Sequence, residues 1–396
     1  MGKTLYNPSR IDAVDALRGF ALLGIVLIHN IEHYNIFRLT DNILPALATV
    51  DKWVGEIIFF IFAGKAYAIF SLLFGFSFYI QFRNREVEGV DFKWRFAWRM
   101  FLLFLFGVFH ALFYAGDILV FFSFVGLILI PMRKAGNKAV LITAIVLMLQ
   151  PFEWGRFIYA IFNPDWVTWS NLHSPYYRMI VQAITEGSLW DVMKANIRNG
   201  QLYSNLWQVG NGRLFQTTAF FLSGMLLGRT QMFVDSAASR RFWKNILLWA
   251  SIAFIPLFML KTYIPPMVTQ RSLLIPLNIV LPSYSNFAFM AILTSGFVLL
   301  WFRRGGMKCQ RMFTPYGRMS LTNYIGQSLI GTFVYFGWGL SMYKYLGSTM
   351  SLLVGIAIFS LQLLFSRWWI ARHRQGPFEY LWRKGTWIQH KLFTFP

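Results

Sequence analysis

Cysteine and charge are both scarce in this sequence of 396 residues. The single cysteine, Cys309, cannot form an intramolecular disulfide, and the sequence has no cysteine cluster that would hold a structural metal. Charged residues make up only 13% of the chain, whereas hydrophobic residues make up 56%. This balance excludes an ordinary soluble domain, whose surface needs more charge.

Acidic residues are the scarcest charged type, since 16 Asp and Glu stand against 37 Lys and Arg, for a formal net charge of +21. Such an excess can indicate nucleic-acid binding. Here the basic residues form short clusters between apolar stretches and do not follow one helix face or one arm, which argues against a nucleic-acid partner. The pattern is typical of the loops of a membrane protein.

Long apolar stretches are abundant. A hydrocarbon core about 30 Å thick is crossed by roughly 20 apolar helical residues. The sequence therefore predicts an all-α, polytopic transmembrane helix bundle in a lipid bilayer, with both termini cytoplasmic under the positive-inside rule. The predicted spans, about ten in number, lie near residues 12–31, 55–81, 96–113, 115–132, 139–160, 212–229, 244–263, 283–302, 319–341 and 347–370.

Two connections between the predicted spans carry further expectations. Region 161–211 should lie outside, and residues 176–199 within it have the apolar spacing of a surface or re-entrant helix, with a simple connecting loop as the alternative. The connection 264–282 contains prolines that disfavour a continuous helix and mark a division between two halves. These prolines are Pro265, Pro266, Pro276 and Pro282.

Ionisable side chains inside an apolar span are costly and become candidates for a functional site. In the first predicted span, Asp15 and Arg18 lie toward the cytoplasmic end, and His29 follows toward the other end. The eleven helical steps from Arg18 to His29 are about three turns, so both share one face roughly 16 Å apart. The structural alternative is that Arg18 only pairs with Asp15.

Three further polar residues stand in the next predicted spans. His110 and Asp117 flank the short turn between the third and fourth spans. A carboxylate beside a neutral imidazole fixes its tautomer and raises its basicity, as a general base requires, whereas the alternative is that Asp117 only caps a helix. Lys65 follows Gly64 in the second span, where it would neutralise a carboxylate or contact an anionic substrate.

A short metal-binding pattern is a minor alternative. The segment from His29 through Glu32 to His33 reads H-x-x-E-H, the signature of a zinc-dependent hydrolase. Because no third ligand is evident, we assign no metal site. The remaining candidates are predicted to bind substrate or donor, with helix-to-helix hydrogen bonding as the alternative: Arg95, Arg99, Arg318, Asn323, Gln327, Glu379 and Arg383.

Several segments resemble the YeiB family of bacterial inner-membrane proteins, over nearly the whole chain. The clearest are RIDAVDALRGFALLGI at 10–25, GKAYAIFSLLFGF at 64–76, GRMSLTNYIGQS at 317–328 and GPFEYLWR at 376–383. The resemblance implies location in the bacterial inner (cytoplasmic) membrane. Together with the predicted spans it indicates three regions: acyltransferase-like helices at 1–135, a fifth span with an extracytoplasmic loop at 136–211, and a C-terminal domain of unknown function at 212–396.

This family is grouped with transmembrane acyltransferases, which implies a reaction. An acyl group would pass from a cytoplasmic donor, such as acyl-coenzyme A, to a small-molecule, glycan or lipid acceptor at the outer face. In such enzymes an Arg followed eleven positions later by a His is a signature, which Arg18 and His29 reproduce. His29 or His110 would remove the acceptor proton, and Asp117 would orient the imidazole.

The donor would be held by basic side chains, and the same residues suit other roles. Arg18, Lys65, Arg95 and Arg99 would bind the donor's phosphate or carboxylate groups. A second hypothesis is a transport or permeation pathway for a small anionic metabolite, a lipid or a proton. A third is a scaffold for another membrane enzyme.

Overall fold

The computed structural model describes residues 11–37, 47–87, 89, 91–166, 171–303 and 307–388. Within these residues the chain is helical and contains no β-strand, which confirms the all-α prediction. Both chain ends lie outside the described residues, so the cytoplasmic location of the termini stays a prediction.

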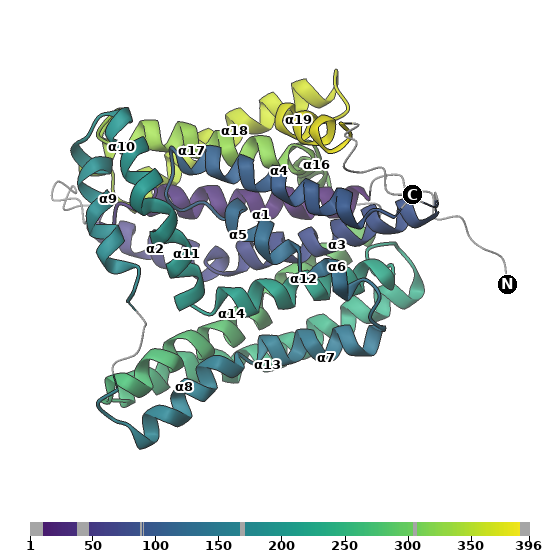
Figure 1. Ribbon diagram of the computed structural model, residues 1–396, viewed down its shortest axis with the longest axis horizontal. Helices are drawn as coiled ribbons and strands as arrows, with labels where there is room; N and C mark the ends of the chain where they lie inside the picture. Colours follow the sequence, from purple (N-terminus) through teal and green to yellow (C-terminus); the bar gives the residue numbers. More distant parts are fainter. Residues whose placement is uncertain are drawn as a thin grey trace.

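Helix α1 (Asp12–Ile31) runs through the middle of the molecule (Figure 1). It is held on several sides, because its two faces are rich in small and apolar residues that neighbouring helices bury. The helix that carries the first polar candidates therefore has a fixed position. Its partners are α2 (Ala48–Phe62), α3 (Lys65–Val87), α14 (Arg271–Phe302), α15 (Lys308–Arg311), α16 (Phe313–Arg318), α17 (Ser320–Tyr335) and α18 (Ser348–Ile370).

Helix α12 (Arg213–Arg229) crosses α3 at very close range. Gly75 of α3 and Gly224 of α12 lie at the crossing, where an added Cβ on either glycine would overlap a backbone carbonyl of the other helix. Small residues at such a crossing are a common means of packing helices in membranes. On its other side α12 packs against α7 (Asn137–Met148).

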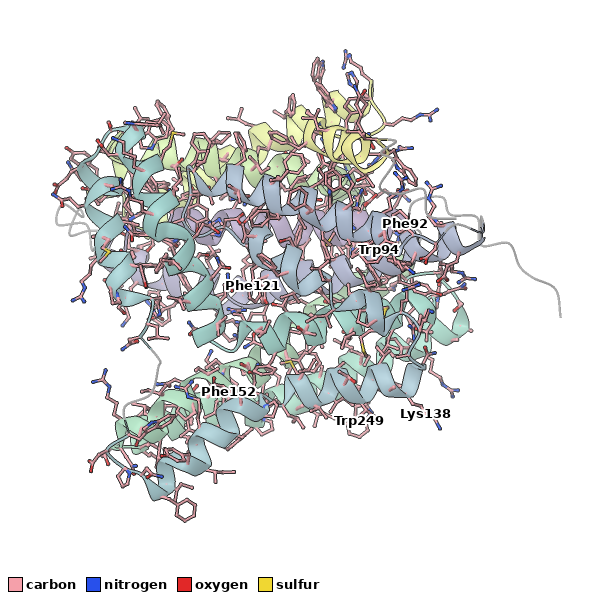
Figure 2. The ribbon with its side chains drawn as sticks, in the orientation of Figure 1. Phe92, Trp94, Phe121, Lys138, Phe152 and Trp249 are labelled. Atoms are coloured by element: carbon pink, nitrogen blue, oxygen red, sulfur yellow. The ribbon has the colours of Figure 1, made fainter. Side chains whose placement is uncertain are left out.

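Helix α13 (Ala237–Met267) pairs with α14 at the lower edge of the molecule in Figure 1, and α8 (Pro151–Phe162) also packs against α14. None of its apolar 18-residue window is buried. Figure 2 shows Trp249 at this outer edge, and its side chain is 66% exposed. An exposed apolar surface of this extent is stable in lipid and not in water, as expected of a membrane protein.

Five segments of the described residues are long and apolar enough to cross a membrane: α1, the α2–α3 segment, α13, α14 and α18. Together, α7 and α8 form a sixth candidate, bent by 40°. The other predicted spans correspond to helices that are shorter or more charged, so the total of about ten spans stays a prediction. These helices are α4 (Lys93–Ala111), α5 (Leu119–Gly126), α6 (Leu129–Met132), α12 and α17.

The prediction of a proline-rich outer loop at 264–282 is wrong. Helix α13 continues through Pro265 and Pro266, and α14 begins at Arg271 and continues through Pro276 and Pro282. Each proline removes one backbone hydrogen bond. Transmembrane helices tolerate this loss because neighbouring helices and hydroxyl side chains satisfy the freed groups. The connection is therefore only residues 268–270.

The second predicted span, 55–81, is not one continuous helix. Helix α2 ends before Ala63, Gly64 has a φ of +76°, and α3 begins at Lys65. A residue with a Cβ would be strained at that φ, and the Cβ would also lie 2.6 Å from the side chain of Asn286. Lys65 thus occupies the first turn of α3, directly after a break, and not the interior of a helix.

Three other predicted spans also differ from the structure. Residues 139–160 belong to two helices, α7 and α8, that meet at a bend of 40°. Residues 115–132 form the separate short helices α5 and α6, and α17 ends at Tyr335 because Phe336 adopts an extended backbone. A 3₁₀ turn follows at Met342–Lys344.

Short helices close the two ends of the bundle. At one end lie α9 (Ser174–Glu186), α10 (Leu189–Ala195), a π-helical turn (Asn196–Gly200) and α11 (Gln201–Gly210) (Figure 1). They confirm the helical spacing predicted for residues 176–199. At the opposite end, α19 (Pro377–Thr386) packs against α4 and α17.

Candidate functional site

A cavity of about 480 Å³, here called the arginine cavity, lies between α1, α3, α4, α17 and α19. Five guanidinium groups and one carboxylate contribute to its wall. Figure 2 labels Phe92, another lining residue, at the end of the molecule where α4 begins. Guanidinium groups in such number suit phosphate or carboxylate ligands. The charged lining residues are Arg18, Arg85, Arg99, Arg318, Arg383 and Glu379.

The guanidinium groups of this cavity are positioned by neighbours. Arg18 donates to Asp15 Oδ1 at 2.7 Å and to Ser77 Oγ at 2.8 Å. The pairing with Asp15 that the structural alternative expected is present, but Arg18 also contacts Ser77 and lines the cavity, so its binding role stays a prediction. Arg99 lies 3.7 Å from the ring centroid of Trp382 and donates to Thr386 Oγ1 at 3.3 Å.

Helix α19 is fixed against the cavity by hydrogen bonds. Glu379 accepts from the backbone N–H of Leu321 at 2.6 Å and from Thr322 Oγ1 at 2.6 Å. Burial raises the pKa of the Glu379 carboxyl group, although these donors favour its ionised form. Arg95 donates to Thr386 O at 2.8 Å, so it braces α19 and is not among the lining residues of the cavity.

A second cavity of about 330 Å³, here called the histidine cavity, lies farther along α1. His29 lines it, with its ring 5.5 Å from that of Tyr34 and 5.2 Å from that of Tyr114. Among the described residues, His29 Nδ1 has no hydrogen-bond partner. Glu32 and Arg213 also line this cavity, so it contains a base and two formal charges of opposite sign.

The two cavities share part of their walls, which we call the apolar layer: Phe70, Leu119, Phe122 and Tyr324. The Phe70 and Phe122 rings stack with centroids 6.2 Å apart and planes at 26°. Arg18 and His29 therefore face cavities on opposite sides of this layer. This arrangement agrees with the prediction that they occupy two levels of one helix face.

His110 and Asp117 form a buried pair, with His110 Nδ1 2.7 Å from Asp117 Oδ1. Asp117 Oδ2 also accepts from the backbone N–H of Val120 at 2.9 Å, at the start of α5. Both the predicted imidazole contact and the alternative helix cap are thus present. Neither residue is among those that line the two cavities, but the His110 ring packs 4.9 Å from Tyr324 of the apolar layer.

The zinc pattern does not form a common site. Helix α1 ends at Ile31 and His33 has a positive φ of 47°, so His29 and His33 do not follow helical spacing. His33 Nε2 instead lies 3.0 Å from Ser351 Oγ. Over the described ranges, no three His, Cys, Asp or Glu residues gather as metal ligands would.

Three other candidates lie away from both cavities. Lys65 is only 4% exposed and lies over the rings of Phe60 and Phe289, 5.7 Å from each centroid. Asn323 Nδ2 donates to Ser366 Oγ at 3.0 Å, which is a helix-to-helix contact. Gln327 is fully buried, and its side-chain amide has no hydrogen-bond partner within the described part of the chain.

Several lining residues were not predicted from the sequence. Arg213 lies at the start of α12, with its guanidinium 4.4 Å from the ring centroid of Tyr67, and Gln208 comes from α11. In the sequence both look like ordinary residues of a connection. A lone arginine directly before an apolar stretch was the only signal that could have identified Arg213.

The chain is similar to three proteins over nearly its whole length. It is 27% identical to the uncharacterized protein YxaH of Bacillus subtilis, covering 97% of this chain and 96% of the relative. It is 26% identical to an uncharacterized 39.9 kDa protein of Bacillus acidopullulyticus, covering 95% and 94%. It is 27% identical to the uncharacterized protein YeiB of Escherichia coli, covering 94% and 95%.

Residues 227–389 match the family model described as protein of unknown function (DUF418). The chain belongs to the YeiB-like family. In this YeiB-like chain the matched segment runs from the end of α12 to just past α19, and so it contributes Arg318, Glu379 and Arg383 to the arginine cavity. No solved structure matches the chain significantly.

Proposed function

We propose that this YeiB-like chain is a membrane-embedded acyltransferase of the bacterial inner membrane. It would take an acyl group from an anionic thioester donor, such as an acyl-coenzyme A, and transfer it to a hydroxyl or amine acceptor. The observation that carries the proposal is the arrangement of two chemically different cavities on either side of one apolar layer.

The arginine cavity suits the donor. Its guanidinium groups would bind phosphate or carboxylate through charge-assisted hydrogen bonds. Basic residues concentrate on the cytoplasmic side of membrane proteins, and so we place this cavity toward the cytoplasm, where acyl-coenzyme A is found.

The apolar layer favours acyl transfer over transport of an anion. Its side chains are three hydrocarbon groups and one phenol, among them the stacked Phe70 and Phe122. A charged metabolite would lose its hydration there without gaining polar partners. An acyl chain and the neutral arm that carries it would pass at much lower free energy.

His29 is the proposed base. The acceptor oxygen or nitrogen attacks the thioester carbonyl, a C–O or C–N bond forms, and the C–S bond breaks. His29 takes the acceptor proton and returns it to the departing thiolate. His110 and Asp117 would position the Tyr324 wall against which the reacting groups lie.

The test uses the full-length protein in lipid nanodiscs with labelled acetyl-coenzyme A, following thioester loss and acyl transfer. Loss of a general base lowers such rates by roughly 100-fold or more, so His29→Ala should be nearly inactive. The exposed His373→Ala is the matched control and should keep full activity.

A second pair of variants tests donor binding. Arg383→Gln removes one guanidinium from the arginine cavity and should raise the donor KM on the order of 10- to 100-fold. Arg372→Gln, an exposed arginine that stacks on Trp368, should leave KM unchanged. Equal rates of thioester loss in the parent protein and in all four variants would contradict the proposal. Uptake of a labelled anion by proteoliposomes, without thioester loss, would support transport.

A further inference from the structure

The histidine cavity carries two opposite charges that do not neutralise each other. Glu32, directly after α1, and Arg213, at the start of α12, both line it. Across the described residues, neither forms a salt bridge, and the Glu32 carboxylate accepts no hydrogen bond. Both side chains are only partly exposed, and Arg213 has a neutral hydrogen-bond partner in Tyr67. A charge in such surroundings without an opposite charge beside it is unfavourable, so a ligand that supplies both complementary charges would be preferred.

Acceptor atoms without donors accompany the negative charge. Gln208 is only 6% exposed and lines the same cavity, yet its Oε1 has no partner in the described ranges. His29 Nδ1 likewise has no hydrogen-bond partner among the described residues. Together with the Glu32 carboxylate, these are three acceptor groups in the lining of one cavity, which suits the three N–H donors of an ammonium group.

Aromatic rings near Glu32 favour a cation as well. Tyr114 and Tyr203 both line the cavity and lie close enough to feel the Glu32 charge. An ammonium beside Glu32 would thus lie near two aromatic rings, and such rings attract cations. Arg213 packs over Tyr67 and lies 5.7 Å from the ring centroid of Trp207, so its side chain is held in place to meet an anionic group.

We propose that the histidine cavity binds a small zwitterion, with its ammonium toward Glu32, Gln208 and His29 and its anionic group toward Arg213. This inference rests on the proposed function in one respect: the zwitterion would be the acyl acceptor, after its ammonium gives one proton to the Glu32 carboxylate and becomes a neutral amine. A free amino acid and a phosphoethanolamine headgroup fit this description equally, because each has an ammonium and an anion a few bonds apart.

The experiment is calorimetric titration of the full-length protein in nanodiscs, without any acyl donor. The probes are L-alanine, O-phosphoethanolamine, N-acetyl-L-alanine, which lacks the ammonium, and L-alaninamide, which lacks the carboxylate. We expect at least one zwitterion to bind about ten-fold or more tightly than either singly charged analogue. Tighter binding of O-phosphoethanolamine than of L-alanine would assign the anion as a phosphate.

Variants connect each charge to its partner. Glu32→Gln should abolish the preference for L-alanine over N-acetyl-L-alanine, and Glu32→Asp should retain it. Arg213→Gln should abolish the preference for L-alanine over L-alaninamide. Controls are Glu186→Gln and Arg198→Gln, which change exposed residues of the same end of the bundle and should leave every affinity unchanged.

The outcomes separate this inference from the proposed function. No binding of either zwitterion, or equal binding of the singly charged analogues, overturns the inference even when His29-dependent thioester loss persists. Selective binding of a zwitterion by a protein that consumes no thioester upholds the inference and removes the acyltransferase.

Discussion

His110 Nδ1 donates a hydrogen bond of 2.7 Å to Asp117 Oδ1, and both side chains are fully buried. The second oxygen of Asp117 caps α5 through the N–H of Val120. One carboxylate thus connects the imidazole to a helix start. Because the pair lies outside the lining of both cavities, its first effect should be on the stability of the fold.

Asp117→Ala should destabilise the protein by about 2–4 kcal/mol, because it leaves two buried donors without an acceptor. Asp117→Asn keeps one acceptor oxygen and should lose less stability. The matched control is Asp191→Ala, since Asp191 takes part in the exposed capping box of α10 with no imidazole partner. Thermal unfolding in one detergent measures all three, and an Asp117→Ala loss no larger than that of the control contradicts the pairing.

The helix boundaries predicted from the sequence are most accurate where an apolar stretch is bounded by charged or polar residues. The predictions 12–31, 212–229 and 347–370 differ from α1, α12 and α18 by no more than one residue at either end. The rule that proline ends a helix failed in α13 and α14. Helix propensities are measured in water, whereas these helices have apolar neighbours. The break at Gly64 was missed because glycine in an apolar run is equally common in unbroken spans.

The candidate site was partly predictable for a related reason. Arg18 and His29 belong to one helix, so helical periodicity alone placed them on one face at two levels. Arg213 and Gln208 reach the histidine cavity only through the packing of α12 against α3 and of α11 against α12, which no local pattern encodes. Lys65 looked functional because it is a lysine in an apolar run, yet it lies away from both cavities.

The stability of the protein should fall with rising pH because of Glu32. Burial raises the pKa of its carboxyl group to about 7 from 4.5, so the folded state holds this proton more tightly than the unfolded state does. The resulting stabilisation, on the order of 1–3 kcal/mol, is complete below pH 4.5 and is lost as the pH rises through about 7.

Glu32→Gln measures this contribution, because the glutamine cannot ionise. His33 acts in the opposite direction, since burial lowers its pKa to about 4 and its neutral form gains stability as the pH rises from there to 6.5. The His33 contribution is the same in the parent protein and in Glu32→Gln, so the difference between their unfolding free energies isolates the contribution of Glu32. Parallel stability curves from pH 4 to pH 8 would exclude a titrating Glu32.

A bulkier apolar layer should slow transfer without weakening donor binding. Phe70 lines both cavities, and Phe70→Trp adds volume between them. We expect kcat to fall about ten-fold or more, most strongly for long acyl chains, with little change in donor KM. Phe74→Trp is the matched control, because Phe74 lines only the arginine cavity. Equal kcat values for both variants would show that the acyl group does not cross this layer.

Lys65 offers a test of whether a buried charge serves the fold or the substrate. The residue is 4% exposed, and in the described part of the chain its ammonium has ring contacts but no carboxylate partner. Lys65→Met keeps the length of the side chain and removes the buried charge, so the unfolding free energy should rise by about 1–3 kcal/mol. The exposed Lys52 of α2 provides the control, and Lys52→Met should change stability by less than about 0.5 kcal/mol.

Because Lys65 lines neither cavity, the donor KM of Lys65→Met should equal that of the parent protein. A raised KM with unchanged stability would instead establish the substrate contact that the sequence predicted for this lysine.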